Sequence, residues 1–171
     1  MKRFIKTFFL FGWLITLTYP VFLLACSLLP QKLRPYLITE VEPTGFTSAR
    51  FEEAANHKPV DMVILGSSHA YRGFDPRIFE ERGIAIFNLG TTAQTPIQSE
   101  LILDTFIDRL GPTMVLLEVY PWGFASDAVE SSIDLLYYGR PIDRLTIVRT
   151  TPTIGVLNSA IYSALRGSKL E

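Results

Sequence analysis

The dominant feature of the hydropathy pattern is an uninterrupted apolar segment at the amino terminus. Residues 7–29 carry no charged side chain. A helix rises 1.5 Å per residue, so this segment is long enough to cross the roughly 30 Å hydrocarbon core of a membrane. Basic residues flank it at Lys2, Arg3, Lys6, Lys32 and Arg34. The pattern predicts an amino-terminal transmembrane helix.

The flanking charges favour a cytoplasmic amino terminus, a single pass through the inner (cytoplasmic) membrane and an extracytoplasmic body. Two other interpretations stay open. A cleaved signal peptide has a shorter apolar region and a small-residue cleavage site, which is absent here. The run Leu23-Leu24-Ala25-Cys26 resembles a bacterial lipoprotein box, in which Cys26 would be acylated. Because Leu28 and Leu29 continue the apolar run, we expect Cys26 to be an ordinary apolar side chain of a membrane helix.

Beyond residue 58 the pattern alternates between short apolar runs and helical faces. Three runs are typical of buried strands and lie at residues 60–65, 84–89 and 114–119. Asp75 followed by Pro76 predicts a helix start, and Pro96 opens a helix with apolar residues at helical spacing. The order β-α-β-α-β with near-continuous apolar strands predicts an α/β fold with a parallel sheet covered on both faces.

Other parts of the chain carry weaker patterns. Residues 30–58 mix proline and glycine with polar residues and are predicted to be a linker, with a short helix at about 47–56. After Pro121, Leu145 to Val148 favour a fourth strand, and residues 127–138 and 152–166 favour helices. The predicted organisation is an anchor at 1–29, a linker at 30–58 and an α/β domain at 59–171.

Composition narrows the classes of function. The net charge of −1 gives no electrostatic support for binding nucleic acid. One cysteine excludes an intrachain disulfide, and the two histidines, His57 and His69, show no metal-ligand spacing with it. The chain lacks both Gly-x-Gly-x-x-Gly and the P-loop pattern, which disfavours a nucleotide-binding fold. We expect neither a metal nor a cofactor.

Candidate chemistry lies in the loops that follow the predicted strands, because ligands bind beyond the carboxyl ends of the strands in open parallel sheets. The loops begin Gly66-Ser67-Ser68-His69, Gly90-Thr91-Thr92-Ala93 and Tyr120-Pro121-Trp122-Gly123. Gly66 permits a tight turn, and Ser68 lies where the next helix should begin. Backbone N–H groups there can stabilise a developing oxyanion, as acyl transfer to a serine requires. The alternative role for Ser68 is a helix cap.

The three loops together resemble the sequence blocks of the SGNH (GDSL-type) hydrolase superfamily. Leu65-Gly66-Ser67-Ser68 resembles the first block, with Ser67 in place of an aspartate. Asn88 to Thr95 resembles the second block and Leu117 to Gly123 the third, so the resemblance covers residues 58–125. It is nearest to membrane-anchored envelope members that carry Gly-Ser-Ser.

The resemblance implies a flavodoxin-like, three-layer parallel sheet and an esterase or acyltransferase that acts on an extracytoplasmic ester, such as an acylated envelope glycan. The implied partners are the membrane and an ester-bearing small molecule or glycan, and not nucleic acid. Ser68 would be the nucleophile, and Gly90 or Ala93 would supply oxyanion donors. The candidate supporting residues are Ser67, His69, Asn88 and Glu118, for which Arg72 is a candidate ion-pair partner.

The chain also departs from the family pattern. Ala93 stands where a glycine is expected, and Trp122 or a neighbour where an asparagine is expected. The family's general base is a histidine in a late Asp-x-x-His block, and no histidine follows His69. The sheet would therefore be incomplete, in a truncated or a degenerate member. The alternative function is a non-catalytic envelope protein that uses the same crevice for binding. A true α/β-hydrolase is disfavoured because Ser68 follows the first strand of the domain.

Overall fold

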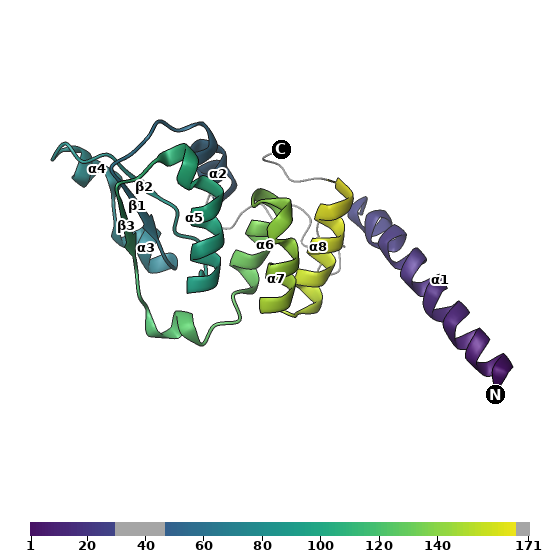
Figure 1. The fold of residues 1–171 in the computed structure, drawn as a ribbon. Helices are drawn as coiled ribbons and strands as arrows, with labels where there is room; N and C mark the ends of the chain where they lie inside the picture. The colour runs from purple at the N-terminus through teal and green to yellow at the C-terminus, as the bar shows by residue number, and fades with distance from the viewer. Residues whose placement is uncertain (30–46, 167–171) are drawn as a thin grey trace.

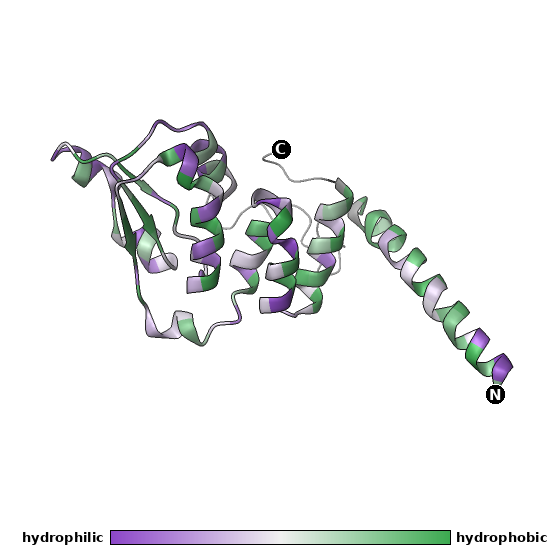
Figure 2. Ribbon diagram, viewed as in Figure 1, coloured by the Kyte–Doolittle hydropathy of each residue, from purple (hydrophilic) through white to green (hydrophobic). Residues whose placement is uncertain are grey.

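The computed structural model describes residues 1–29 and 47–166. Helix α1 (Lys2–Ser27) projects away from the body of the protein (Figure 1). It is long and apolar enough to cross a membrane, and most of its side chains contact no other part of the protein. Figure 2 shows hydrophobic residues along most of its length. Pro20 lies inside α1, so it does not end the helix.

The body contains the predicted parallel sheet. Strands β1 (Met62–Leu65), β2 (Ile86–Asn88) and β3 (Met114–Leu117) lie in the order β2-β1-β3. Val63 is opposite Phe87 on one side of β1 and opposite Val115 on the other. All three carboxyl ends therefore lie at the same edge of the sheet, which brings the three candidate loops together. The mixed α/β class predicted from the sequence is confirmed.

Helices cover both faces of the sheet. Helices α3 (Ser68–Gly73) and α4 (Pro76–Glu80) cover one face, over Met62, Ile64 and Ile86. The predicted cap at Asp75 is present, because its carboxylate accepts from Arg77 N–H at 3.1 Å. Helices α2 (Thr47–Asn56) and α5 (Pro96–Leu110) cover the other face. The larger core forms there and includes Phe51, Val63, Leu89, Ile102 and Phe106.

A second group of helices packs on the outer side of α2 and α5 (Figure 1). It consists of α6 (Val129–Tyr138), α7 (Arg144–Thr150) and α8 (Ile154–Arg166). The 3₁₀ turn η2 (Pro121–Phe124) precedes α6, and η3 (Pro141–Asp143) lies between α6 and α7. The predicted strand at Leu145 to Val148 is wrong, because these residues lie in α7. Helical geometry buries Ile147 while Leu145 stays exposed. An apolar run of four residues is too short for its periodicity to distinguish a strand from a helix.

Helix α2 belongs to the body, although the sequence assigned it to the linker. Phe51 and Ala54 on α2 are fully buried in the main core. The ring of Phe51 packs against Phe106 of α5 at 5.2 Å between centroids. The remainder of the predicted linker, residues 30–46, lies outside the described residues. The described body therefore begins at Thr47.

Asp134 of α6 is an ionisable group in the contact between α6 and α2. Burial raises the pKa of its carboxyl from 3.8 to about 7, while a hydrogen bond from Thr47 and the charge of Arg50 oppose that rise. Repulsion from the negative charge of Glu130 on the same helix raises the pKa of Asp134 further. Below about pH 7 the folded protein therefore favours the protonated form of Asp134.

Replacing Asp134 with asparagine should stabilise the protein at alkaline pH. The unfolded carboxyl ionises above 3.8 and the folded one above about 7, so the wild type loses stability relative to the variant as the pH rises between these values. The difference should reach at most about 4 kcal/mol above pH 7. Urea unfolding of both proteins in detergent at pH 5 and pH 8 measures it. A difference that does not grow between the two pH values would contradict the buried-acid interpretation.

Candidate active site

The first loop turns sharply from β1 into α3 at Gly66. Gly66 has φ +140°, a conformation that side-chain-bearing residues rarely adopt. A Cβ atom on Gly66 would lie 2.6 Å from Glu118 Cβ and 2.8 Å from Glu118 Oε2. Glycine is therefore required both by the backbone conformation and by the closeness of Glu118.

Ser67 and Glu118 hold the first and third loops together. Glu118 Oε2 accepts from the Ser67 backbone N–H at 2.9 Å and from the Ser67 hydroxyl at 2.8 Å. Glu118 N–H in turn donates to Leu65 O at 2.9 Å, which extends the pairing of β3 with β1. The partner of Glu118 is thus Ser67 and not Arg72, whose guanidinium lies 5.5 Å from the Tyr71 ring centre. The buried side of the carboxylate is satisfied by hydrogen bonds.

Ser67, and not Ser68, is the cap of α3. Its hydroxyl oxygen accepts from His69 N–H at 3.2 Å. The same oxygen lies 3.0 Å from His69 Nδ1. Since the single hydroxyl proton of Ser67 is donated to Glu118, the His69 contact requires a proton on Nδ1. Glu118 and Ser67 therefore select the tautomer of neutral His69 that has its lone pair on Nε2.

The His69 ring is exposed to the crevice between the first and third loops. Its centre lies 4.4 Å from that of the Tyr120 ring, with the planes tilted by 41°. The ring is therefore held on one side by Tyr120 and at Nδ1 by Ser67. The structure thus places His69, a candidate supporting residue, against the first and third loops.

Asn88 ties the second loop to α3. Its amide donates to Ala70 O at 3.0 Å and Phe74 O at 3.2 Å, and its Oδ1 accepts from Gly90 N–H at 3.0 Å. The Gly90 N–H is thus already used within the protein, and its role as an oxyanion donor stays a prediction. A Cβ on Gly90 would lie 3.0 Å from Ala70 Cβ, so glycine allows the two loops to approach closely.

A buried hydrogen-bond network holds the rest of the second loop. Gln94 Oε1 accepts from Thr91 N–H at 2.8 Å and from the Thr91 hydroxyl at 3.0 Å. The Gln94 amide donates to Ser99 of α5, and the Thr91 hydroxyl contacts that of Ser131 on α6. Sequence reasoning missed this network. The sequence feature that could have revealed the network is a set of small polar residues at positions where a helix in the core buries its side chains.

The three loops surround a cavity of about 230 Å³. Ser68, His69, Ala93, Tyr120 and Trp122 are among its lining residues. Ala93 has φ +52°, in the left-handed region, and within the described chain neither its N–H nor that of Ser68 has a hydrogen-bond acceptor. Two backbone donors and one hydroxyl therefore share one cavity. Trp122 is 70% exposed at its rim.

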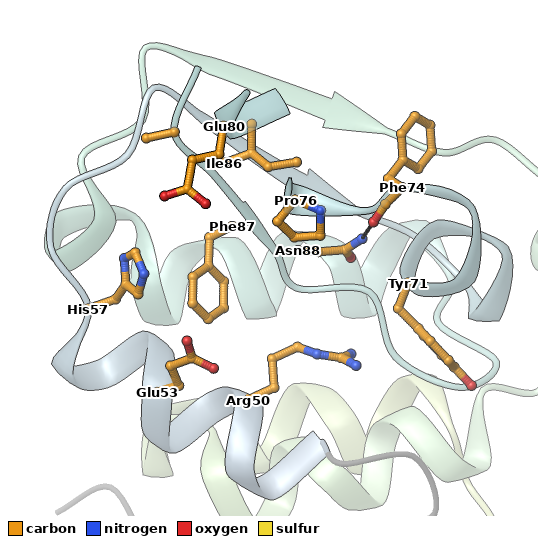
Figure 3. A pocket seen from close by; sticks show the side chains of 11 residues that line it. Arg50, Glu53, His57, Tyr71, Phe74, Pro76, Glu80, Ile86, Phe87 and Asn88 are labelled. Atoms are coloured by element: carbon orange, nitrogen blue, oxygen red, sulfur yellow. Dashed lines mark hydrogen bonds between the residues drawn. The ribbon is translucent and has the colours of Figure 1, made fainter. Parts of the chain in front are cut away.

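A larger cavity of about 380 Å³ lies elsewhere, between α2 and the outer edge of β2. Figure 3 shows Arg50, Glu53 and His57 reaching into it from α2 and the residue just after it. His57 Nδ1 donates to Lys58 O at 2.8 Å, and its ring packs on Phe87. Within its described lining, this cavity lacks a serine or cysteine nucleophile. The smaller cavity is therefore the better candidate active site.

Arg50 and Tyr71 line the larger cavity and connect α2 and α3 to the second loop. Arg50 donates to Gly90 O, and its guanidinium lies 5.0 Å from the Tyr71 ring centre. Burial lowers the pKa of Arg50, and the charge of Asp134 opposes this effect. The Tyr71 hydroxyl lies 3.4 Å from the Thr92 hydroxyl, next to Ala93. Helix α2 thereby supports the second loop from the side opposite the candidate site.

Among the described residues, no cluster of histidine, cysteine and carboxylate side chains could hold a metal ion. Comparisons of the chain with protein-family models, with curated proteins and with solved structures found no match. The function is therefore argued from the geometry of the site.

Gly66→Ala should destabilise the protein by more than about 2 kcal/mol, because the new side chain meets both a strained backbone conformation and Glu118. Gly73→Ala is the matched control, since nothing lies within 4 Å of a Cβ there. Urea unfolding in detergent, followed by circular dichroism, compares the two variants. Equal stability of both would show that the turn is not as tight as described.

Ser67→Ala should lower the free energy of unfolding by about 1–2 kcal/mol, because it removes the helix cap and a hydrogen bond to Glu118. Ser68→Ala should change it by less than about 0.5 kcal/mol, because the Ser68 hydroxyl has no partner in the described chain. Thermal or urea unfolding distinguishes these two adjacent positions. The reverse order would mean that the roles of the two serines are exchanged.

Proposed function

We propose that this protein is a membrane-anchored serine esterase or acyltransferase of the SGNH type, with Ser68 as its nucleophile. One observation carries the proposal: Ser68, Ala93 and the oriented imidazole of His69 line one cavity at the carboxyl ends of the strands, and the N–H groups of Ser68 and Ala93 have no acceptor within the described chain. This is the set of groups that acyl transfer to a serine requires.

The chemistry follows from these positions. The Ser68 oxygen attacks the ester carbonyl carbon, and the carbonyl oxygen takes up the negative charge. The N–H groups of Ser68 and Ala93 are the donors available to that oxygen. The C–O bond to the alcohol then breaks, and the alcohol leaves with the proton that Ser68 gave up. Water or an acceptor alcohol releases the acyl group by the same steps in reverse.

His69 is the general base that this chain offers. Its Nδ1 is held by Ser67, which is held by Glu118, so Nε2 is left to accept a proton. Neighbouring residues at the start of a helix point in different directions, so His69 accepts the proton of Ser68 through one water molecule. The hydrogen bonds from the Glu118 carboxylate through the Ser67 hydroxyl orient the imidazole of His69, as a carboxylate orients the histidine in a serine hydrolase triad. This base replaces the late histidine of the family pattern.

The exposure of the site favours a large substrate. Tyr120 is 43% and Trp122 70% exposed at the rim of the cavity, and exposed aromatic rings provide flat apolar surfaces for sugar rings. The substrate class that fits best is an ester on an extracytoplasmic polymer such as an acylated envelope glycan. In this proposal α1 crosses the inner membrane and the body lies outside the cytoplasm. The order β2-β1-β3 agrees with the start of a flavodoxin-like sheet.

Labelling with a fluorophosphonate, which reacts covalently with activated serines, tests the proposal. The full chain in detergent should be labelled, Ser68→Ala should not, and Ser67→Ala should be labelled more slowly. His69→Asn keeps an N–H that can reach Ser67 but has no base, so its labelling rate should fall by about 10²-fold or more with little loss of stability.

Mass spectrometry of the labelled peptide identifies the modified residue. Thr92→Ala is the control, because Thr92 lines the same cavity without a proposed role in the reaction. A folded wild-type chain that takes up no label would refute the enzyme and favour a protein that only binds ligands in this crevice. Labelling that survives Ser68→Ala would refute the assignment of the nucleophile.

A further inference from the structure

Helix α8 has an apolar stripe on its exposed side. Ile154 is 67% exposed, Leu157 41% and Leu165 51%, and the half-buried Ile161 lies between them. The spacing of these four residues places them along one face of the helix. Residues 154–165 contain no charged side chain. A surface helix of a water-soluble domain carries charged or polar residues at such positions.

The buried side of α8 carries apolar residues such as Val156 and Ala160 of the main core, and it also carries the polar residues of the helix. Asn158, Ser159 and Ser163 are all buried. The Ser163 hydroxyl donates to Ala160 O at 3.1 Å, and Ser163 O accepts from Arg144 of α7 at 3.3 Å. Polar groups that face inward and apolar groups that face outward are the arrangement expected of a helix bordered by lipid.

The carboxyl-terminal turns of α1 pack along α8. The Tyr19 hydroxyl donates to Asn158 Oδ1 at 2.7 Å. Leu23 and Cys26 are 2% and 7% exposed and form a small apolar cluster with Tyr19 and Ile161. Tyr19 is thus level with Asn158, and the later residues of α1 are level with Ile161. Figure 1 shows the carboxyl-terminal end of α1 against α8, both helices rising in the same sense, with the rest of α1 slanting away from the body.

The contact with α1 fixes the depth of α8 once α1 is taken to cross the membrane. Crossing needs about 20 apolar residues, and counted from Lys6 these end near Cys26. At 1.5 Å per residue, Tyr19 then lies about 10 Å inside the outer boundary of the hydrocarbon. Asn158 lies beside Tyr19, and Ile154 lies one helical turn deeper. The start of α8 is therefore at the level of the lipid chains.

We infer that α8 lies in the outer half of the bilayer beside α1, with phospholipid covering Ile154, Leu157 and Leu165. This rests on the proposed membrane crossing of α1, and not on the proposed chemistry of Ser68. The helices α6 to α8 are then the part of the body that contacts the membrane and holds the rest of the body at its surface.

Depth-dependent fluorescence quenching tests this inference on the full chain. In a Cys26→Ala background, single cysteines at Leu157, at Leu10 of α1 and at Asp108 of α5 are labelled with a nitrobenzoxadiazole dye. The chain is reconstituted in phosphatidylcholine and phosphatidylglycerol vesicles that contain doxyl-labelled lipid. The dye at Leu157 should be quenched as Leu10 is, and the dye at the exposed Asp108 should not. Fluorophosphonate labelling of each variant reports separately on Ser68.

Quenching at Leu10 without quenching at Leu157 would overturn the inference and leave the anchor in place. Absence of quenching at both positions would overturn the membrane crossing and this inference with it, whatever the result for Ser68. Efficient disulfide formation between Leu157→Cys chains, without quenching by lipid, would show that a second copy covers the stripe and would also overturn the inference. Quenching at Leu157 in a chain that takes up no fluorophosphonate would support the membrane position of α8. It would refute only the proposed enzymatic activity.

Discussion

The candidate site depends on the carboxylate of Glu118. One of its oxygens accepts two hydrogen bonds from Ser67, and this joins the end of β3 to the turn after β1. Because the carboxylate takes the only hydroxyl proton of Ser67, the hydroxyl must act as an acceptor toward His69. One half-buried charge thus sets the geometry of a turn, the direction of a hydroxyl and the tautomer of an imidazole. The requirement for glycine at position 66 follows from the same closeness.

The second loop is held independently of Glu118. Buried hydrogen bonds connect Gln94 with Thr91 and Ser99. Asn88 accepts from the Gly90 N–H, and Arg50 donates to the Gly90 carbonyl oxygen. Such networks are rigid only when every member is satisfied. This rigidity lets Ala93 keep a left-handed conformation with an N–H that has no acceptor in the described chain. An N–H donor without an acceptor lowers the stability of a fold, but next to a cavity it can stabilise negative charge that develops in a reaction.

The three strands, their parallel pairing and the three loops could be predicted from the sequence because short apolar runs ended by Gly66, Gly90 and Pro121 carry a strong local signal. The structure also bears out the short helix before β1 and the cap at Asp75. The strand at Leu145 to Val148 could not be excluded, since four apolar residues fit either a strand or a helix. The partner of Glu118 was missed because it lies 51 residues away along the chain, and the opposite charge of Arg72 suggested a simpler pairing.

Strand β3 is the least covered part of the sheet. Met114, Val115 and Leu117 are 61%, 42% and 43% exposed, and among the described strands β3 pairs only with β1. Charged residues that commonly protect an edge strand are absent from these four positions. The sheet is therefore able to grow in this direction. Another strand laid parallel beside β3 would bury these side chains and end beside Tyr120 and His69, so whatever followed that strand would form a further wall of the cavity that holds Ser68.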